Sequence, residues 1–428
     1  MGRDSDGRRV TVPDGGYRCS IMVSYDLAIT GGRCLVGGRL VRADIFIRDG
    51  RIARIARRSL PADRAIDARD SILLPGLVDL HVHLRDGDLA HKETFATGSA
   101  ACAQGGITTA VDMPNNDPPT DTIGALEGRE AAAARSSRID FLINPALPFR
   151  GGPPPDVPAF GELFCYQHGT GALLDTPPPP KSLLMFHAES DRTDEGEREC
   201  LPDLLADLHR RELANPVHLC HISTAAGLDA VRANPGATCE VTPHHLLLTT
   251  RPEDPLFRVR PPLRRSHDVT ALWQGVTDGT VTTIGSDHAP HSRAEKESGD
   301  PPCGIPGAPT MLPLLFTAFL RRRLPLALLA RLTSENPARL LGLYPAKGAL
   351  REGSFADMVV VRKEEGRIRA EDLYTMARST PFDGHRTAGT VVATVRRGEV
   401  IYLHDHITSS GGGRNVKGLL KELRTKNA

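Results

Sequence analysis

The sequence predicts an α/β protein, in which a (β/α)8 barrel of the TIM type carries a small β-sandwich domain. The first observation is that eight apolar runs of strand length follow one another in the middle of the chain. The second is that segments able to form helices, such as 91–105 and 201–215, separate these runs. Apolar strands that alternate with helices are typical of a buried parallel sheet. The runs are GLVDLHVHL, GITTAVDMP, IDFLINPAL, GELFCY, SLLMFHAE, PVHLCHIS, ATCEVTPHH and TVTTIGSDHAP.

Two segments of a different texture flank this middle part. Stretches such as DIFIRDGRIARIA and TVVATVRRGEVIYLH alternate apolar and polar residues, as half-buried strands do. Each segment is too short to bury a core alone, so we expect both to form one β domain. The connection PFRGGPPPDVPAF is too rich in proline and glycine for a good helix. The expected division is a flexible N-terminal tail at 1–22, the β domain at 23–72 and 345–405, the barrel at 73–344, and a loose C-terminal tail at 406–428.

The composition favours a small-molecule substrate. The 428 residues include 53 basic and 52 acidic side chains. The two kinds nearly cancel, so the net charge gives no indication of binding to nucleic acid or to an anionic membrane. No apolar run approaches the roughly 18 residues of a membrane span, and the first residues do not resemble a signal peptide. The eight cysteines form no CxxC pair, which fits a reducing compartment. We therefore expect a cytoplasmic protein.

Polar residues gather where the predicted barrel strands end, which is where barrels of this type place their catalytic groups. His81 and His83 form an HVH pair with the period of a strand, so both imidazoles point to one side and can bind one ion. Taken singly, His187 and His221 are more often core histidines, but with the others they indicate a metal site. The candidate ligands are His81, His83, Glu162, His187, His221 and Asp287.

This set of side chains suits Zn²⁺ or a similar divalent ion, with one or two ions per chain. Imidazoles and carboxylates without a cysteine framework are typical ligands for it. Such an ion lowers the pKa of bound water toward about 7 and polarises a carbonyl group. Asp287 would be a ligand and also the acid/base, taking a proton from the water and passing it to a leaving nitrogen. The implied reaction is hydrolysis of an amide-like bond, or its reversal.

Seven motifs in this order, from about residue 73 to 342, carry a resemblance to the dihydroorotases of the amidohydrolase superfamily. They are PGLVDLHVHLRD, GGITTAVDMPNNDPP, FHAE, HLCHIST, CEVTPHHL, PPLR and GSDHAPH. The resemblance implies a metal-dependent hydrolase of cyclic amides, which interconverts N-carbamoyl-L-aspartate and L-dihydroorotate through a metal-bound hydroxide. It also implies that His81, His83 and Asp287 bind the more buried ion and that His187 and His221 bind the other. A homodimer is the assembly that the resemblance suggests.

The resemblance further implies that Arg85, Asn115 and His291 bind the substrate carboxylate. A guanidinium fork suits a carboxylate, and the other two side chains can donate the remaining hydrogen bonds. One alternative is a related enzyme acting on a hydantoin, allantoin or another imide, although a neutral hydantoin would leave Arg85 without a partner. Another is a non-catalytic, dihydroorotase-like partner protein. The roles of Glu240, His244 and His245 stay open, and one or more of them would support the metal ligands.

The fourth strand departs from the family pattern. Many dihydroorotases carry a carboxylated lysine there that bridges two metals, whereas this chain has Glu162. No lysine occurs between Lys92 and Lys181, and Lys181 precedes the fifth strand, at its wrong end. Glutamate is three atoms shorter, which is roughly 3–4 Å of reach. Glu162 is therefore a bridging ligand, a residue with an altered role, or part of an inactive centre. The following segment CYQHGTG, with His168, is expected to be an active-site loop.

Overall fold

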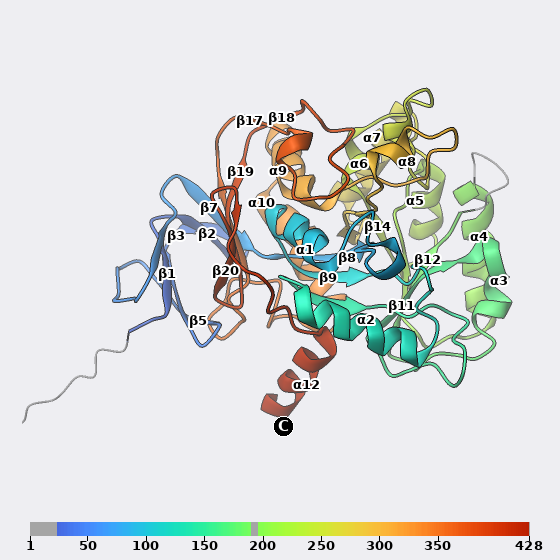
Figure 1. The fold of residues 1–428 in the computed structure, drawn as a ribbon, viewed down its shortest axis with the longest axis horizontal. Coiled ribbons are helices and arrows are strands. Elements are labelled where there is room, and N and C mark those ends of the chain that lie inside the picture. The colour runs from blue at the N-terminus through green and yellow to red at the C-terminus, as the bar shows by residue number, and fades with distance from the viewer. Residues whose placement is uncertain (1–23, 190–195, 428) are drawn as a thin grey trace, which may run out of the picture.

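The computed structural model describes residues 24–189 and 196–427, so the expected tail at 1–22 lies outside the described residues. A barrel occupies one side of the molecule and a β sandwich the other (Figure 1). In these described ranges, no helix has the length and apolar content needed to cross a bilayer.

The barrel has the eight strands that the sequence predicts, in the predicted order. Every paired neighbour is parallel. Two hydrogen bonds connect the remaining edges: Gly161 N donates to Pro145 O over 3.1 Å, and His83 N donates to His288 O over 2.8 Å. The strands are β8 Leu77–Val82, β9 Ile107–Asp112, β10 Asp140–Ile143, β11 Ala159–Phe164, β12 Leu183–His187, β13 Val217–Leu219, β14 Ala237–Val241 and β15 Thr283–Ile284.

Helices cover the outside of the barrel, and several begin at a threonine whose side chain caps the first turn. Thr94, Thr122 and Thr224 each accept a hydrogen bond from the backbone N–H three residues on, which stabilises a helix start. The helices are α1 Phe95–Gln104, α2 Ile123–Ser136, α3 Cys165–Leu173, α4 Gly196–Arg210, α5 Ala225–Arg232, α6 Pro243–Leu247, α7 Ser266–Asp278, α8 Arg293–Lys296, α9 Met311–Arg321, α10 Leu326–Ala330 and α11 Asn336–Leu340.

Two connections around β11 test the local expectations. The proline-rich connection before β11 contains no helix, as predicted. The segment after it was expected to be a loop, and this is wrong, because it forms α3, in which helical turns lie on either side of a break at Gly169 (φ 69°). Leu173 is buried in the core of the barrel, and this burial favours the helical turns that carry it inward. The side chain of His168 lies outside the described residues.

The β sandwich is built from both ends of the chain, as predicted. Strand β7 (Ser71–Pro75) lies between β2 (Arg33–Val36) from the N-terminal segment and β16 (Met358–Arg362) from the C-terminal segment. The two sheets share one apolar core, with Ile29 and Ile45 from one sheet and Leu73, Val360 and Val395 from the other. The first sheet is β5 Arg51–Ala56, β4 Asp44–Arg48, β1 Leu27–Thr30 and β6 Ala65–Asp67; the second is β21 His406–Ile407, β20 Glu399–Leu403, β19 Thr390–Arg396, β16 Met358–Arg362, β7, Ser71–Pro75, β2 Arg33–Val36 and β3 Arg39–Arg42.

Two C-terminal segments leave the expected arrangement. Residues 363–389, which carry β17 Gly366–Arg367 and β18 Arg386–Thr387, were expected in the β domain, but Ile368 and Phe382 pack with Leu314 of α9 on the barrel. The loose tail is also wrong, because residues Val416–Asn427 form the helix α12 (Figure 1). This helix packs beside β10. Its apolar residues at 416, 419, 420 and 423 have the spacing of one helix face.

A buried ionic network joins the barrel to the sandwich. Lys347 is fully buried, and its Nζ lies 2.7 Å from Oδ2 of Asp140 in β10 and also contacts Asp357 beside β16. Arg397, in the turn between β19 and β20, pairs with the other oxygen of Asp140 at 2.6 Å. Because buried charges are costly unless they are paired, this network favours one relative placement of the two parts.

Candidate metal centre

All six candidate ligands come together at the carboxyl ends of the barrel strands. His81 lies near the end of β8 and His83 just after it, Glu162 lies in β11 and His187 ends β12. His221 and Asp287 follow β13 and β15 by two and three residues. Each of the six is at most 6% exposed. The parallel strand order therefore produces the buried cluster that the sequence predicts.

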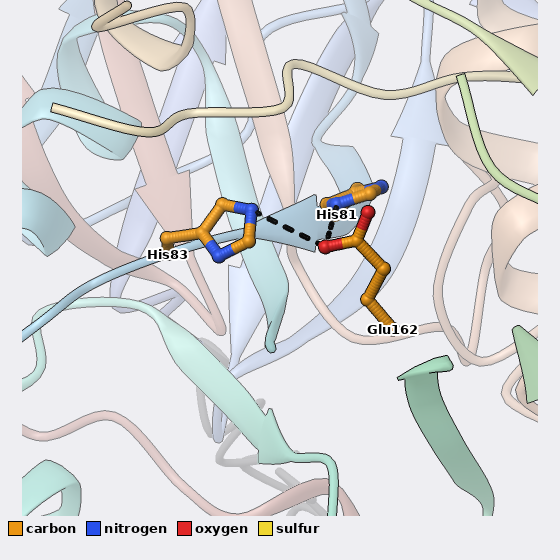
Figure 2. A group of neighbouring side chains, drawn as sticks. All are labelled: His81, His83 and Glu162. Atoms are coloured by element: carbon orange, nitrogen blue, oxygen red, sulfur yellow. Dashed lines mark ion pairs between the residues drawn. The ribbon is translucent and has the colours of Figure 1, made fainter. Parts of the chain in front are cut away.

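Glu162 lies between two pairs of histidines. Its Oε1 is 2.6 Å from His187 Nδ1 and 2.7 Å from His221 Nε2. Its Oε2 is 3.6 Å from His81 Nε2 and 3.9 Å from His83 Nε2 (Figure 2). Glu162 thus belongs to both of the three-residue groups that could hold a metal ion in the described chain. This glutamate reaches both pairs although it is shorter than a carboxylated lysine, because the rings of His81 and His221 are only 5.1 Å apart.

Asp287 completes the cluster on the side of the first pair. Its Oδ1 lies 3.2 Å from His83 Nε2 and 3.7 Å from His81 Nε2. Burial raises the pKa of this carboxyl, but the hydrogen bond from His83 and the charge of His81 outweigh burial and hold the pKa below its usual range. Asp287 is therefore an ionised carboxylate beside the imidazoles.

The protonation of the cluster fits a site for a cation. Burial raises the pKa of Glu162, yet His187 and His81 hold it well below its usual range. Burial lowers the pKa of His187, but Glu162 raises it to about 9. Glu162 is thus ionised beside a protonated His187. The positive charge of this imidazolium stands where the charge of a divalent ion would balance the carboxylate. His81 Nε2 makes no hydrogen bond within the described residues, as expected of a nitrogen that faces a metal position.

Acceptors behind the first histidine pair orient its rings. Glu240 Oε1 lies 3.1 Å from His81 Nδ1, and Asn115 Oδ1 lies 2.8 Å from His83 Nδ1. A carboxylate only accepts hydrogen bonds, so Nδ1 of His81 carries a hydrogen, and Nε2 faces the centre. Such acceptors fix the orientation and basicity of metal-binding histidines. Glu240 therefore supports a candidate ligand, and Asn115, expected at the substrate, also contacts His83.

The second pair has supporting residues that the sequence analysis missed. Glu189 Oε2 lies 3.6 Å from His187 Nε2, and Arg264 Nη2 lies 3.1 Å from Glu189 Oε1. Both residues belong to motifs quoted above, FHAE and PPLR, and their place in these motifs could have identified them as residues of the site. The two histidines of CEVTPHHL have different surroundings. His244 Nε2 lies 4.0 Å from Asp287 Oδ2, whereas His245 contacts Thr242 and the carbonyl of Pro261.

A cavity of about 660 Å³ opens beside the cluster. Arg85, Asn115, Glu162 and Asp287 line it, together with two arginines that the sequence analysis did not single out, Arg150 and Arg260. His291 is not among the lining residues. It lies behind them, with its Nε2 3.5 Å from Arg85 Nη2 and 2.9 Å from the carbonyl oxygen of Cys303. Two of the three expected carboxylate-binding residues thus face the cavity directly.

Three residues of this region have left-handed backbone conformations that non-glycine residues rarely adopt. The φ angles are 55° at Arg85, 35° at His221 and 45° at Asp287. Each such conformation costs on the order of 1–3 kcal/mol, and such strain concentrates at functional sites. The fold accepts this cost at three residues that the sequence analysis selected, as it also does at nine others in the described chain.

Comparisons with known proteins agree with this geometry. The model of the dihydro-orotase-like family matches residues 70–149, and that of the amidohydrolase family matches residues 208–401. The dihydroorotase of Methanosarcina mazei is 34% identical, over 92% of this chain and 98% of its own. That of Pyrococcus abyssi is 35% identical, over 90% of this chain and 97% of its own.

Solved structures show the same fold. The L-hydantoinase (dihydropyrimidinase) of Arthrobacter aurescens is 27% identical and superposes with a TM-score of 0.78, over 90% of this chain and 98% of its own. The D-hydantoinase of a Thermus species is 24% identical and superposes with a TM-score of 0.79, over 91% of this chain and 98% of its own. Because the curated relatives match nearly from end to end at more than 30% identity, this chain belongs to the dihydroorotase family of the amidohydrolases.

Proposed function

We propose that this protein is a dihydroorotase, which interconverts N-carbamoyl-L-aspartate and L-dihydroorotate with one or two Zn²⁺ ions. The observation that carries the proposal is the position of Glu162 between two histidine pairs, with Asp287 beside one pair and Arg85 lining the same cavity. Curated relatives named dihydroorotase support the choice of substrate.

The residues divide the work between metal binding and substrate binding. His81, His83 and Asp287 would hold one ion, His187 and His221 the other, and Glu162 would contact both. A bound divalent ion activates a water molecule and polarises the amide carbonyl.

Asp287 would move the proton. It is ionised, buried and held in place by His83, so it can take a proton from the attacking water. On ring opening it passes this proton to the departing ring nitrogen, and on ring closure it takes the proton back. Asp287 is only 6% exposed, so water screens these electrostatic contacts little.

Arg85 favours a substrate with a free carboxylate. It is 7% exposed, and within the described parts of the chain its Nε has no hydrogen-bond partner. A buried, unpaired guanidinium nitrogen is costly, and a carboxylate can satisfy it with a charge-assisted hydrogen bond. A neutral hydantoin offers no such group, so the cavity favours dihydroorotate over the hydantoins that the structural neighbours are named for.

The test combines metal content with turnover. Purified protein supplied with Zn²⁺ should hold at least one ion per chain and turn over both dihydroorotate and N-carbamoyl-aspartate, while turnover of an unsubstituted hydantoin should be much slower. Asp287→Asn should abolish turnover, because it removes both a metal ligand and the proton carrier. Protein that binds no divalent metal and acts on none of these compounds would instead support a non-catalytic, dihydroorotase-like partner protein.

A further inference from the structure

Two hydrogen-bond donors lie side by side at the wall of the cavity, with Arg85 lining it and His291 behind. His291 Nε2 is 2.9 Å from the carbonyl oxygen of Cys303, which only accepts, so this nitrogen carries a hydrogen. Arg85 Nη2, which only donates, is 3.5 Å from the same nitrogen. Two donors do not bond to each other, so Arg85 Nη2 does not spend its hydrogen on this ring and can offer it to an acceptor in the cavity. A ring with its hydrogen on Nε2 therefore keeps the guanidinium available for a carboxylate.

The other nitrogen of the same ring faces a lysine. Lys92 Nζ lies 3.3 Å from His291 Nδ1. An ammonium group only donates hydrogen bonds, so Nδ1 must offer its lone pair. The contacts at the two ends of the ring thus require the same neutral tautomer, with hydrogen on Nε2. Burial, together with the charges of Arg85 and Lys92, lowers the pKa of His291 to about 3, so the ring stays neutral.

Lys92 is itself held in place by a helix cap. Its Nζ lies 3.0 Å from Glu295 Oε1. The other oxygen of Glu295 accepts from the backbone N–H and the hydroxyl of Ser292, both over 2.9 Å, in the capping box of α8. The side chains of Lys92 and Glu295 are 16% and 27% exposed, so water competes only in part for this pair. The cap thus orients the ammonium group that faces His291.

We propose that Lys92 is a positioning residue of the carboxylate subsite, which holds His291 with its hydrogen on the nitrogen beside Arg85. The proposal rests on the proposed function, because the substrate supplies the carboxylate. Lys92 does not line the cavity. It acts through His291, and its charge also makes the edge of the cavity more favourable for an anion.

The kinetic test separates binding from the chemical step. Lys92→Met should raise KM for dihydroorotate and for N-carbamoyl-aspartate about tenfold, with kcat changed less than about twofold, because it removes one charge-assisted hydrogen bond to the ring. Lys92→Arg keeps charge and donors and should restore most of the affinity. Lys181→Met makes the same change at an exposed lysine ahead of β12 and should leave KM unchanged.

A spectroscopic test reports on the ring without turnover. Nitrogen-15 spectra of histidine-labelled protein, with His291→Gln to assign the signal, should show His291 as the Nε2–H tautomer. Lys92→Met removes one of the two contacts that select this tautomer, so a population with the hydrogen on Nδ1 should appear beside it. A wild-type ring with its hydrogen on Nδ1, or a Lys92→Met variant with unchanged KM and an unchanged tautomer, would overturn the proposal. If the wild type turns over neither compound, the proposed function fails, whereas the spectra still decide the role of Lys92.

Discussion

Replacing Glu162 with glutamine asks whether one carboxylate joins the two histidine pairs. The side chain is 5% exposed, and its oxygens lie 2.6–3.9 Å from nitrogens of four imidazoles. Glutamine keeps the shape and removes the charge. Two unit charges about 4 Å apart interact by about 4 kcal/mol at an effective dielectric constant of about 20. Since about 1.4 kcal/mol is tenfold in affinity, Glu162→Gln should weaken binding of a divalent ion about a thousandfold.

The assay is metal content per chain after gel filtration in metal-free buffer, together with turnover of dihydroorotate and N-carbamoyl-aspartate. Glu162→Asp keeps the charge on a shorter stem and should retain part of the metal. Glu371→Gln makes the same change on an exposed side chain and should behave as wild type. A Glu162→Gln protein with full metal content and full turnover would refute the bridging role.

Three further expectations concern the residues behind the centre and the stability of the fold. Glu240→Gln should weaken Zn²⁺ binding about 10–100-fold by loosening His81, and an unchanged affinity in a zinc titration would contradict this. Lys347→Met should lower the free energy of unfolding by about 3–5 kcal/mol, because the buried Asp357 loses its cation and Asp140 keeps only Arg397; in denaturant unfolding, a loss no larger than that of Lys363→Met on the surface would count against it. Burial lowers the pKa of His218 from 6.5 to about 4, so its contribution to stability is present above pH 6.5 and is lost as the pH falls toward 4. The contribution lost over this pH window is about 3 kcal/mol. His218→Gln should therefore flatten the dependence of the unfolding free energy on pH between 6.5 and 4, and the same slope in the variant and the wild type would contradict this.

The sequence predictions failed in a few segments whose structure depends on distant parts of the chain. The tail at 406–428 was expected to be loose because of its glycine-rich start, but four apolar residues from Val416 onward form one helix face that packs beside the barrel. The segment after β11 was expected to be a loop, although the buried Leu173 holds it as a helix. In both places a few apolar contacts with distant parts of the chain outweigh the local composition. The interaction of Glu189 with Arg264, 75 residues apart, was missed because neither residue belongs to a periodic pattern.

The sequence by itself determined the order of eight buried strands, the β domain built from both chain ends, and the set of ligand-type residues at strand ends. Patterns along the chain carry this information, because strand period and apolar run length are local properties. Only the tertiary structure decided that Glu162 reaches both histidine pairs, that Asn115 contacts His83, and that His291 lies behind the cavity wall. These relations depend on closure of the barrel, which brings strands far apart in sequence to within a few ångströms of one another.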